Sequence, residues 1–438
     1  MMPREGIRDG HCAGYIVQVT WGGFAGKASG PHMLGYRGSS IRTRGPIPHA
    51  EQTGGESDVS GEARDLHFRA LVVDTHVDTA QRLAFDRFDL GVRHSDGSVD
   101  IPRLREGGVG AVFFAIWTPG TITGPEAVQR GLEQIRAVQR QAELHANDLM
   151  LAASASDIRR AKDAGRIAIL LGIEGGHLIN SDLGILRRYY ALGARYMTLT
   201  HAVNVEWADA STDKPAHNGL SDFGKQVVRE MNRLGMMVDV SHVSDKTFYD
   251  VLSTSAAPVI ATHSCCRALC DTPRAMSDEM IGALAEKGGV IQITFHTGFL
   301  SQKFRGAVKA NPGLKAEIEA RVGEICGENQ ACQLLESARL MRELMEQGKL
   351  PRVEWTEILD HIDHAVKLVG ADHVGVGSDF DGADMPYGME DASRLPRLTV
   401  GLMQKGYGES DIRKILGGNT LRVMQDVEAI AHKTEETP

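Results

Sequence analysis

The stretch VVDTHVDT, residues 72–79, carries His76 and Asp78 directly behind a short apolar run. Side chains two residues apart point to the same side of an extended chain. An imidazole and a carboxylate therefore leave the end of this predicted strand together. Such a pair alone is most often a cap or a hydrogen-bonded loop, so its meaning depends on the residues at the ends of the other strands.

Seven further short apolar runs occur along the chain, and longer helical patterns such as residues 127–146 and 354–369 separate them. The eight predicted strands cover residues 70–75, 109–117, 167–173, 195–200, 236–241, 258–262, 289–295 and 373–378. Most are almost continuously apolar, as strands covered on both faces are. Eight units of strand followed by helix predict a parallel sheet that closes into a (β/α)₈ TIM-type barrel.

Two segments depart from this alternation. Residues 1–62 are rich in Gly, Ser, Pro and Arg without an apolar period, and they predict a flexible N-terminal extension before a barrel at 63–430. Residues 300–351 are polar and helix-prone, which predicts a helical insertion between the seventh and eighth strands. We expect this insertion to be a lid or an interface element.

Composition excludes several classes of function. A formal net charge of −9 and the absence of clustered Lys and Arg argue against nucleic-acid binding. No run reaches the roughly 20 apolar residues of a membrane helix, and no signal-like segment precedes the barrel. The six cysteines are sparse, and two of them, Cys265 and Cys266, are adjacent; no C-x-x-C pair occurs. We therefore expect reduced cysteines and a cytoplasmic location.

Six of the eight predicted strands end in a side chain that can bind a metal. These residues are His76, Asp78, Glu174, His201, His242, His263 and Asp379. In a parallel barrel the carboxyl ends of all strands open on one face. Gathering these groups there would be costly without a cation, and mixed imidazole and carboxylate ligands suit zinc, with manganese, cobalt or iron also possible.

Seven candidates are too many for one catalytic ion that keeps a position open, so two ions fit better. His76 and Asp78 can hold one ion, His242 and His263 can hold a second, and Glu174 can bridge them. Two such ions generate a hydroxide and polarise the group that it attacks, which predicts hydrolysis. Asp379 remains as the acid/base, and His201 remains to stabilise the developing oxyanion.

The ordered motifs H-x-D, E-G-G-H, L-T-H, D-V-S-H, T-H-S and S-D-F-D-G resemble those of the membrane or renal dipeptidase family, within the amidohydrolase-like metal barrels. In this chain they begin at His76, Glu174, Leu199, Asp239, Thr262 and Ser378. The resemblance runs from about residue 70 to about residue 425, and the sequences around the motifs look most like bacterial members.

The resemblance implies a distorted (β/α)₈ barrel that holds two Zn²⁺ ions per chain and hydrolyses dipeptides whose C-terminal residue is L or D. By position, His76, Asp78 and Glu174 would bind one zinc, and Glu174, His242 and His263 the other. His201 would stabilise the tetrahedral intermediate, and Asp379 would be the acid/base. Arg274 matches the family arginine that binds the substrate carboxylate, although Ala275 follows it where the family commonly has Asn. A homodimer is also implied.

Two alternatives remain. A related metal hydrolase acting on N-acyl amino acids, lactones or phosphotriesters is one, but many of those relatives carry a carboxylated lysine where this chain has Glu174. A non-catalytic metal-binding barrel is the other, and the presence of Asp379, His201 and every expected ligand argues against it. His296, after the seventh strand, could contact substrate or be an ordinary loop histidine.

Overall fold

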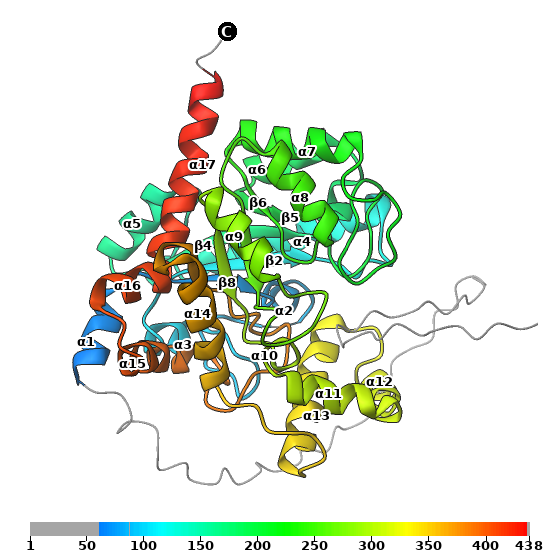
Figure 1. Ribbon diagram of the computed structural model, residues 1–438, viewed down its shortest axis with the longest axis vertical. Coiled ribbons are helices and arrows are strands. Elements are labelled where there is room, and N and C mark those ends of the chain that lie inside the picture. Colours follow the sequence, from blue (N-terminus) through cyan, green and yellow to red (C-terminus); the bar gives the residue numbers. More distant parts are fainter. Residues whose placement is uncertain (1–60, 87, 436–438) are drawn as a thin grey trace, which may run out of the picture.

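The computed structural model describes residues 61–86 and 88–435 (Figure 1). The predicted extension of residues 1–62 lies outside this part of the chain, except for Gly61 and Glu62. These two residues begin helix α1 (Gly61–Arg69), which packs against α15 (Pro396–Gln404).

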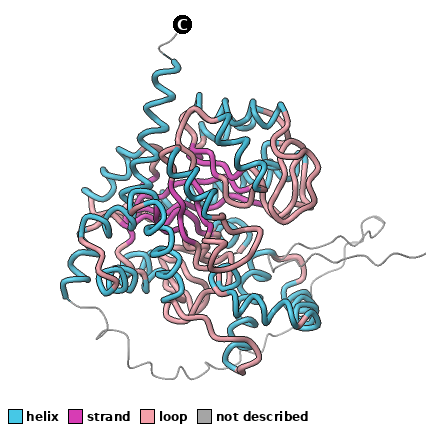
Figure 2. The backbone as a smooth tube through the Cα atoms, in the orientation of Figure 1, coloured by secondary structure: helices cyan, strands magenta, loops and turns pink. Residues whose placement is uncertain are grey.

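The centre of the fold is a ring of parallel strands with helices around it (Figure 2). Its strands are, in spatial order, β1 (Val72–Val77), β2 (Val109–Trp117), β4 (Ile167–Glu174), β5 (Ala194–Thr198), β6 (Met237–Asp239), β7 (Ile260–Ser264), β8 (Val290–Ile293) and β9 (Val374–Val376). A parallel bridge between Val77 and Phe380 joins β1 to the segment after β9. The barrel is therefore nearly closed, and the predicted (β/α)₈ class is confirmed.

The barrel has local irregularities. The register shifts in the pairs β1/β2, β4/β5 and β7/β8. A short strand that the sequence did not predict, β3 (Leu149–Leu151), pairs only with β4. The predicted seventh and eighth strands are β8 and β9.

The helices around the barrel begin and end where the sequence provides caps. In α7, for example, the Ser221 hydroxyl accepts a hydrogen bond from the Gly224 amide, and Gly235 ends the helix at φ 80°. Besides α1 and α15, the helices around the barrel are α2 (Ala80–Phe85), α3 (Ile101–Glu106), α4 (Gly124–Leu144), α5 (Ala155–Asp163), α6 (Leu183–Ala191), α7 (Asp222–Leu234), α8 (Asp245–Thr254), α9 (Asp278–Glu286), α14 (Thr356–Val369), α16 (Glu409–Arg413) and α17 (Asn419–Glu435). Among the described helices, none has both the length and the apolar character that crossing a membrane requires.

Between β8 and β9 the chain forms α10 (Thr297–Leu300), α11 (Gln302–Ala310), α12 (Pro312–Cys326) and α13 (Gln330–Glu346). The last three gather beside the barrel (Figure 1). They have a small hydrophobic core of their own, which includes Phe304, Ile318, Val322 and Leu340. We call α11–α13 the helical insertion.

A disulfide between Cys326 and Cys332 joins the end of α12 to the start of α13. The expectation that the cysteines are reduced is wrong for this pair. A turn brings their Cα atoms to 5.5 Å, within the range that a disulfide spans. Sequence spacing alone does not show such a turn. Cys265, Cys266 and Cys270 are unpaired and buried.

Candidate metal centre

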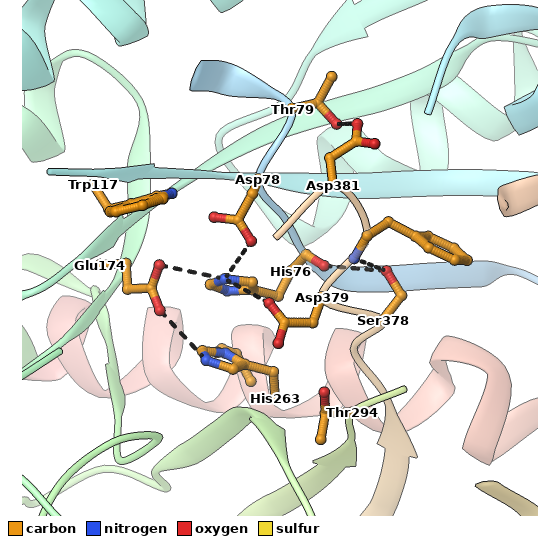
Figure 3. Close-up of polar contacts among 12 residues, drawn as sticks. His76, Asp78, Thr79, Trp117, Glu174, His263, Thr294, Ser378, Asp379 and Asp381 are labelled. Atoms are coloured by element: carbon orange, nitrogen blue, oxygen red, sulfur yellow. Dashed lines mark hydrogen bonds and ion pairs between the residues drawn. The ribbon is translucent and has the colours of Figure 1, made fainter. Parts of the chain in front are cut away.

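The seven predicted strand-end residues lie together and all are buried. Figure 3 shows His76, Asp78, Glu174, His263 and Asp379 of this set. β1 begins and ends two residues later than predicted, so His76 lies inside the strand instead of after it. Glu174 is the last residue of β4, and His263 is the fourth residue of β7. His201 and His242 each follow their strand by three residues.

The carboxylate of Glu174 lies among four imidazoles, one near one of its oxygens and three near the other, and the His76 and His263 rings lie 3.8 Å apart, centroid to centroid. Its Oε2 lies 3.5 Å from Nε2 of His76. Its Oε1 lies 3.1 Å from Nε2 of His242, 3.4 Å from Nε2 of His263 and 3.7 Å from Nε2 of His201. Glu174 thus offers one oxygen to each side, as a ligand shared by two ions would.

The distances between these atoms fit a zinc ion. Donor atoms at about 2.0 Å from a tetrahedral zinc lie about 3.3 Å from one another, close to the contacts around Glu174. Nε2 of His242 and Nε2 of His263 face each other at 2.8 Å. Nε2 of His76 is buried without a hydrogen-bond partner among the described residues, although Asp78 Oδ2 is 3.8 Å away. A metal ion would satisfy nitrogens that the protein leaves without partners.

Neighbouring hydroxyl groups orient two of the imidazoles. The Tyr196 hydroxyl donates to the Thr75 carbonyl at 3.1 Å and lies 3.0 Å from Nδ1 of His76. Thr262 donates to Asp239 at 2.6 Å and lies 3.0 Å from Nδ1 of His263. Because each hydroxyl already donates its hydrogen to another oxygen, it can accept a hydrogen bond from the Nδ1–H of the histidine. In that tautomer Nε2 carries no hydrogen and can bind a metal.

The buried carboxylates of this cluster shift the pKa values of their neighbours. Burial alone would lower the pKa of His76, but Glu174, Asp78 and Asp379 raise that pKa to about 10. Burial raises the pKa of Asp78 well above its usual range, and the charges of Glu174 and Asp379 act in the same direction. Carboxylates of this kind are stabilised by a nearby cation.

Asp379 is held at the mouth of the barrel by backbone bonds to β1. Its amide donates to the His76 carbonyl at 3.0 Å, and the Asp78 amide donates to the Phe380 carbonyl at 2.8 Å. Asp379 has φ 68°, a strained conformation for a residue with a Cβ. A Cβ on Gly382 would meet Oδ2 of Asp78 at 1.8 Å, so a larger residue there would displace the Asp78 carboxylate.

Arg274 is buried beside the candidate ligand His263, and among the described residues no carboxylate lies within 4.0 Å of its guanidinium. Its guanidinium donates from Nη2 to the His263 carbonyl at 3.1 Å, and its Nε has no hydrogen-bond partner there. The face of the Phe299 ring lies 5.3 Å from Cζ. Burial lowers the pKa of Arg274. A buried guanidinium with an Nε that lacks a partner is suited to a carboxylate ligand, although Arg274 is not among the residues that line the pocket above the candidate ligands.

A pocket opens above Asp78, Glu174, His201 and Asp379. His296 also lines it, with Nδ1 of its ring 3.1 Å from Oδ1 of Asp384. Burial would lower the pKa of His296, but the charge of Asp384 raises it. Helix α13 forms the outer wall of the pocket with Leu334, Ser337, Ala338 and Met341. The barrel contributes Trp117 at the end of β2, Val203 after β5, and the residues Pro119, Gly120 and Thr121 of the loop after β2.

Comparison with known proteins shows the family to which this chain belongs. The profile of "Membrane dipeptidase (Peptidase family M19)" matches residues 60–438. The chain belongs to this family. It is 32% identical to human Dipeptidase 3 over 389 residues, which cover 86% of this chain and 69% of the human protein. It is 32% identical to rat Dipeptidase 3 over 344 residues, which cover 77% of this chain but only 60% of the rat protein.

The fold of this family member also resembles a solved structure. The crystal structure of the probable dipeptidase PvdM from Pseudomonas aeruginosa superposes with a TM-score of 0.72 at 29% identity. The superposition covers 84% of this chain and 98% of that chain. The fold is therefore shared with this probable dipeptidase over most of the chain.

Sequence reasoning missed several residues of this dipeptidase-family site. Asp384 lies two residues after the S-D-F-D-G motif, and an acidic residue so close to the end of a strand is a sequence signal for a site residue. Trp117 ends β2, one of the two strands without a predicted ligand. The α13 residues have helical spacing, but spacing does not reveal which surface a helix covers.

Proposed function

We propose that this chain is a metallopeptidase that hydrolyses dipeptides at a centre of two zinc ions. The observation that carries the proposal is the placement of Glu174, with Oε2 toward His76 and Oε1 toward His242 and His263. A single buried carboxylate between two sets of nitrogens is the arrangement that two ions sharing one ligand require.

In this proposal His76, Asp78 and Glu174 would hold one ion, and Glu174, His242 and His263 would hold the other. The bound ions would activate water and polarise the scissile carbonyl. Tyr196 and Thr262 keep the two imidazoles in the tautomer that leaves Nε2 available. Other divalent transition metals could replace zinc at such ligands.

Asp379 transfers the proton in this proposal. It lies at the mouth of the barrel, with Oδ1 4.0 Å from Nε2 of His76, and it lines the pocket. Its carboxylate can accept a proton from the attacking water and deliver it to the amine that leaves. His201 lines the same pocket, and a protonated ring nitrogen there can donate to the oxygen of the scissile carbonyl as negative charge develops on it.

Arg274 binds the C-terminal carboxylate of the dipeptide in this proposal. A guanidinium can pair with two carboxylate oxygens at once, and such pairing orients the substrate as well as binding it. A substrate that lacks this carboxylate would leave a buried cation without a partner.

Two measurements on the purified protein test the proposed function. Metal analysis should find close to two ions per chain, and one ion or none would contradict the shared-ligand arrangement. A panel of L,L and L,D dipeptides should be hydrolysed, whereas N-acyl amino acids, lactones and a phosphotriester should not. Turnover of one of those other classes without dipeptide turnover would assign the chain to a different hydrolase activity.

A homodimer and a cytoplasmic location remain proposals from the sequence. Light scattering on the purified chain should give twice the monomer mass of 47.5 kDa. The location can be tested by fractionating cells of the source organism. Because disulfides are rare in the cytosol, thiol labelling of Cys326 and Cys332 in those cells is an independent test.

A further inference from the structure

One face of α13 forms part of the pocket above the metal centre. Leu334, Ser337, Ala338 and Met341 line the pocket, at positions i, i+3, i+4 and i+7 of the helix. This spacing places all four on one side of α13. Three of them are apolar, and the buried Ser337 hydroxyl has no hydrogen-bond partner among the described residues.

The facing wall of the pocket comes from barrel loops and is also largely apolar. It includes Trp117 at the end of β2 and Val203 after β5. The Trp117 ring lies 5.2 Å from the His201 ring, centroid to centroid, so this wall borders the catalytic residues directly.

Contacts on both sides hold α13 in this position. Arg342 donates to the Met385 carbonyl at 3.0 Å and stacks over the Tyr387 ring at 3.9 Å, both in the segment after β9. At the other end, Asn329 donates to Asp86 at 2.9 Å, and its own side chain caps α13. Because contacts with the rest of the protein fix both ends of α13, its pocket-lining face has a defined position.

The order of the strands indicates which part of a dipeptide meets this wall. Around the barrel, β2 lies four strands from β7 in either direction, so the two are opposite. Arg274 is in the loop after β7, and Trp117 ends β2. With its carboxylate on Arg274 and its peptide bond at the metal ligands, a dipeptide extends its N-terminal residue toward Trp117.

We propose that the α13 face and Trp117 form the recognition pocket for the side chain of the N-terminal residue, and that they select an apolar side chain of limited size. The proposal rests on the proposed dipeptidase function and adds the residues that set substrate choice. The helical insertion then has a defined role, because it contributes the outer wall of this pocket.

The test compares two Ala→Leu variants within the helical insertion. Ala338→Leu narrows the pocket, whereas Ala320→Leu adds the same bulk at an exposed position of α12. For Phe-Ala and Leu-Ala, we expect kcat/KM of Ala338→Leu to fall at least about tenfold. This is the effect expected when the added methylene and methyl groups exclude a side chain from an apolar pocket. Gly-Ala and Ala-Phe should change less than about threefold. Ala320→Leu should match the parent on every substrate.

Leu334→Ala provides an independent second variant, because it removes bulk from the same face. We expect it to raise the ratio of Phe-Ala to Ala-Ala turnover while metal content stays unchanged. Equal loss on Phe-Ala and Ala-Phe, loss on Ala-Phe alone, or no change in either variant would overturn the pocket assignment and leave the dipeptidase function standing. If the parent chain hydrolyses no dipeptide, the proposed function fails and this assignment fails with it.

Discussion

The metal centre and the outer wall of the pocket are built in different ways. The candidate ligands come from the ends of barrel strands, and parallel backbone hydrogen bonds fix where those ends lie. The wall comes from α13, which is placed by side-chain packing, a few polar contacts and a disulfide. Changes at strand ends should therefore abolish the chemistry, whereas changes in the helical insertion should alter selectivity or local stability.

The largest effect is expected from Glu174→Gln. An amide carries no charge and cannot balance two cations, so metal content should fall well below two ions per chain. Losing the metal contribution of several kcal/mol should lower kcat/KM by more than about four powers of ten. Metal analysis and kinetics check both, with Glu286→Gln, at an exposed position of α9, as the matched control. A variant that keeps two ions would show that Glu174 is not the shared ligand.

Asp379→Asn should leave metal content almost intact and lower kcat by about two to four powers of ten, the usual size of a lost acid/base contribution. The amide keeps the shape of the carboxylate but cannot take up the proton. Metal analysis and steady-state kinetics on one preparation make this test. Because Asp379 also lies within 4.0 Å of His76, loss of one ion would instead identify it as a metal ligand. Unchanged turnover would exclude both roles.

Arg274→Met should mainly affect substrates with a free C-terminal carboxylate. Hydrogen bonds to charged groups contribute about 1.5–3 kcal/mol, so kcat/KM for such dipeptides should fall about tenfold to a hundredfold. Amidated dipeptides, already poor substrates, should change little further. The control is Arg229→Met, at an exposed position on α7. Equal losses on free and amidated substrates would show that Arg274 stabilises the site instead of binding the carboxylate.

The barrel was largely predictable from the sequence, but the pocket wall that α13 forms was not. Each predicted strand overlaps an observed one because a buried parallel strand needs a continuous apolar run, which is visible in the chain. A strand end also determines the direction of the next side chain, so His76 and Glu174 could be placed together. The docking of α13 depends on long-range contacts such as Asn329 with Asp86, and no local pattern in the sequence encodes them.

The smallest effect on catalysis is expected when the Cys326–Cys332 disulfide is removed by changing both residues to Ala. The disulfide closes a short loop, so its constraint on the unfolded chain stabilises the folded state by about 2 kcal/mol. Removing it should destabilise the helical insertion by that amount. Hydrogen exchange should increase in α12 and at the start of α13, while exchange in the barrel strands and metal content stay unchanged. Reducing the disulfide in the unmodified chain should reproduce the result. Loss of metal in either case would mean that the helical insertion and the metal centre are one cooperative unit, which would contradict the distinction between them.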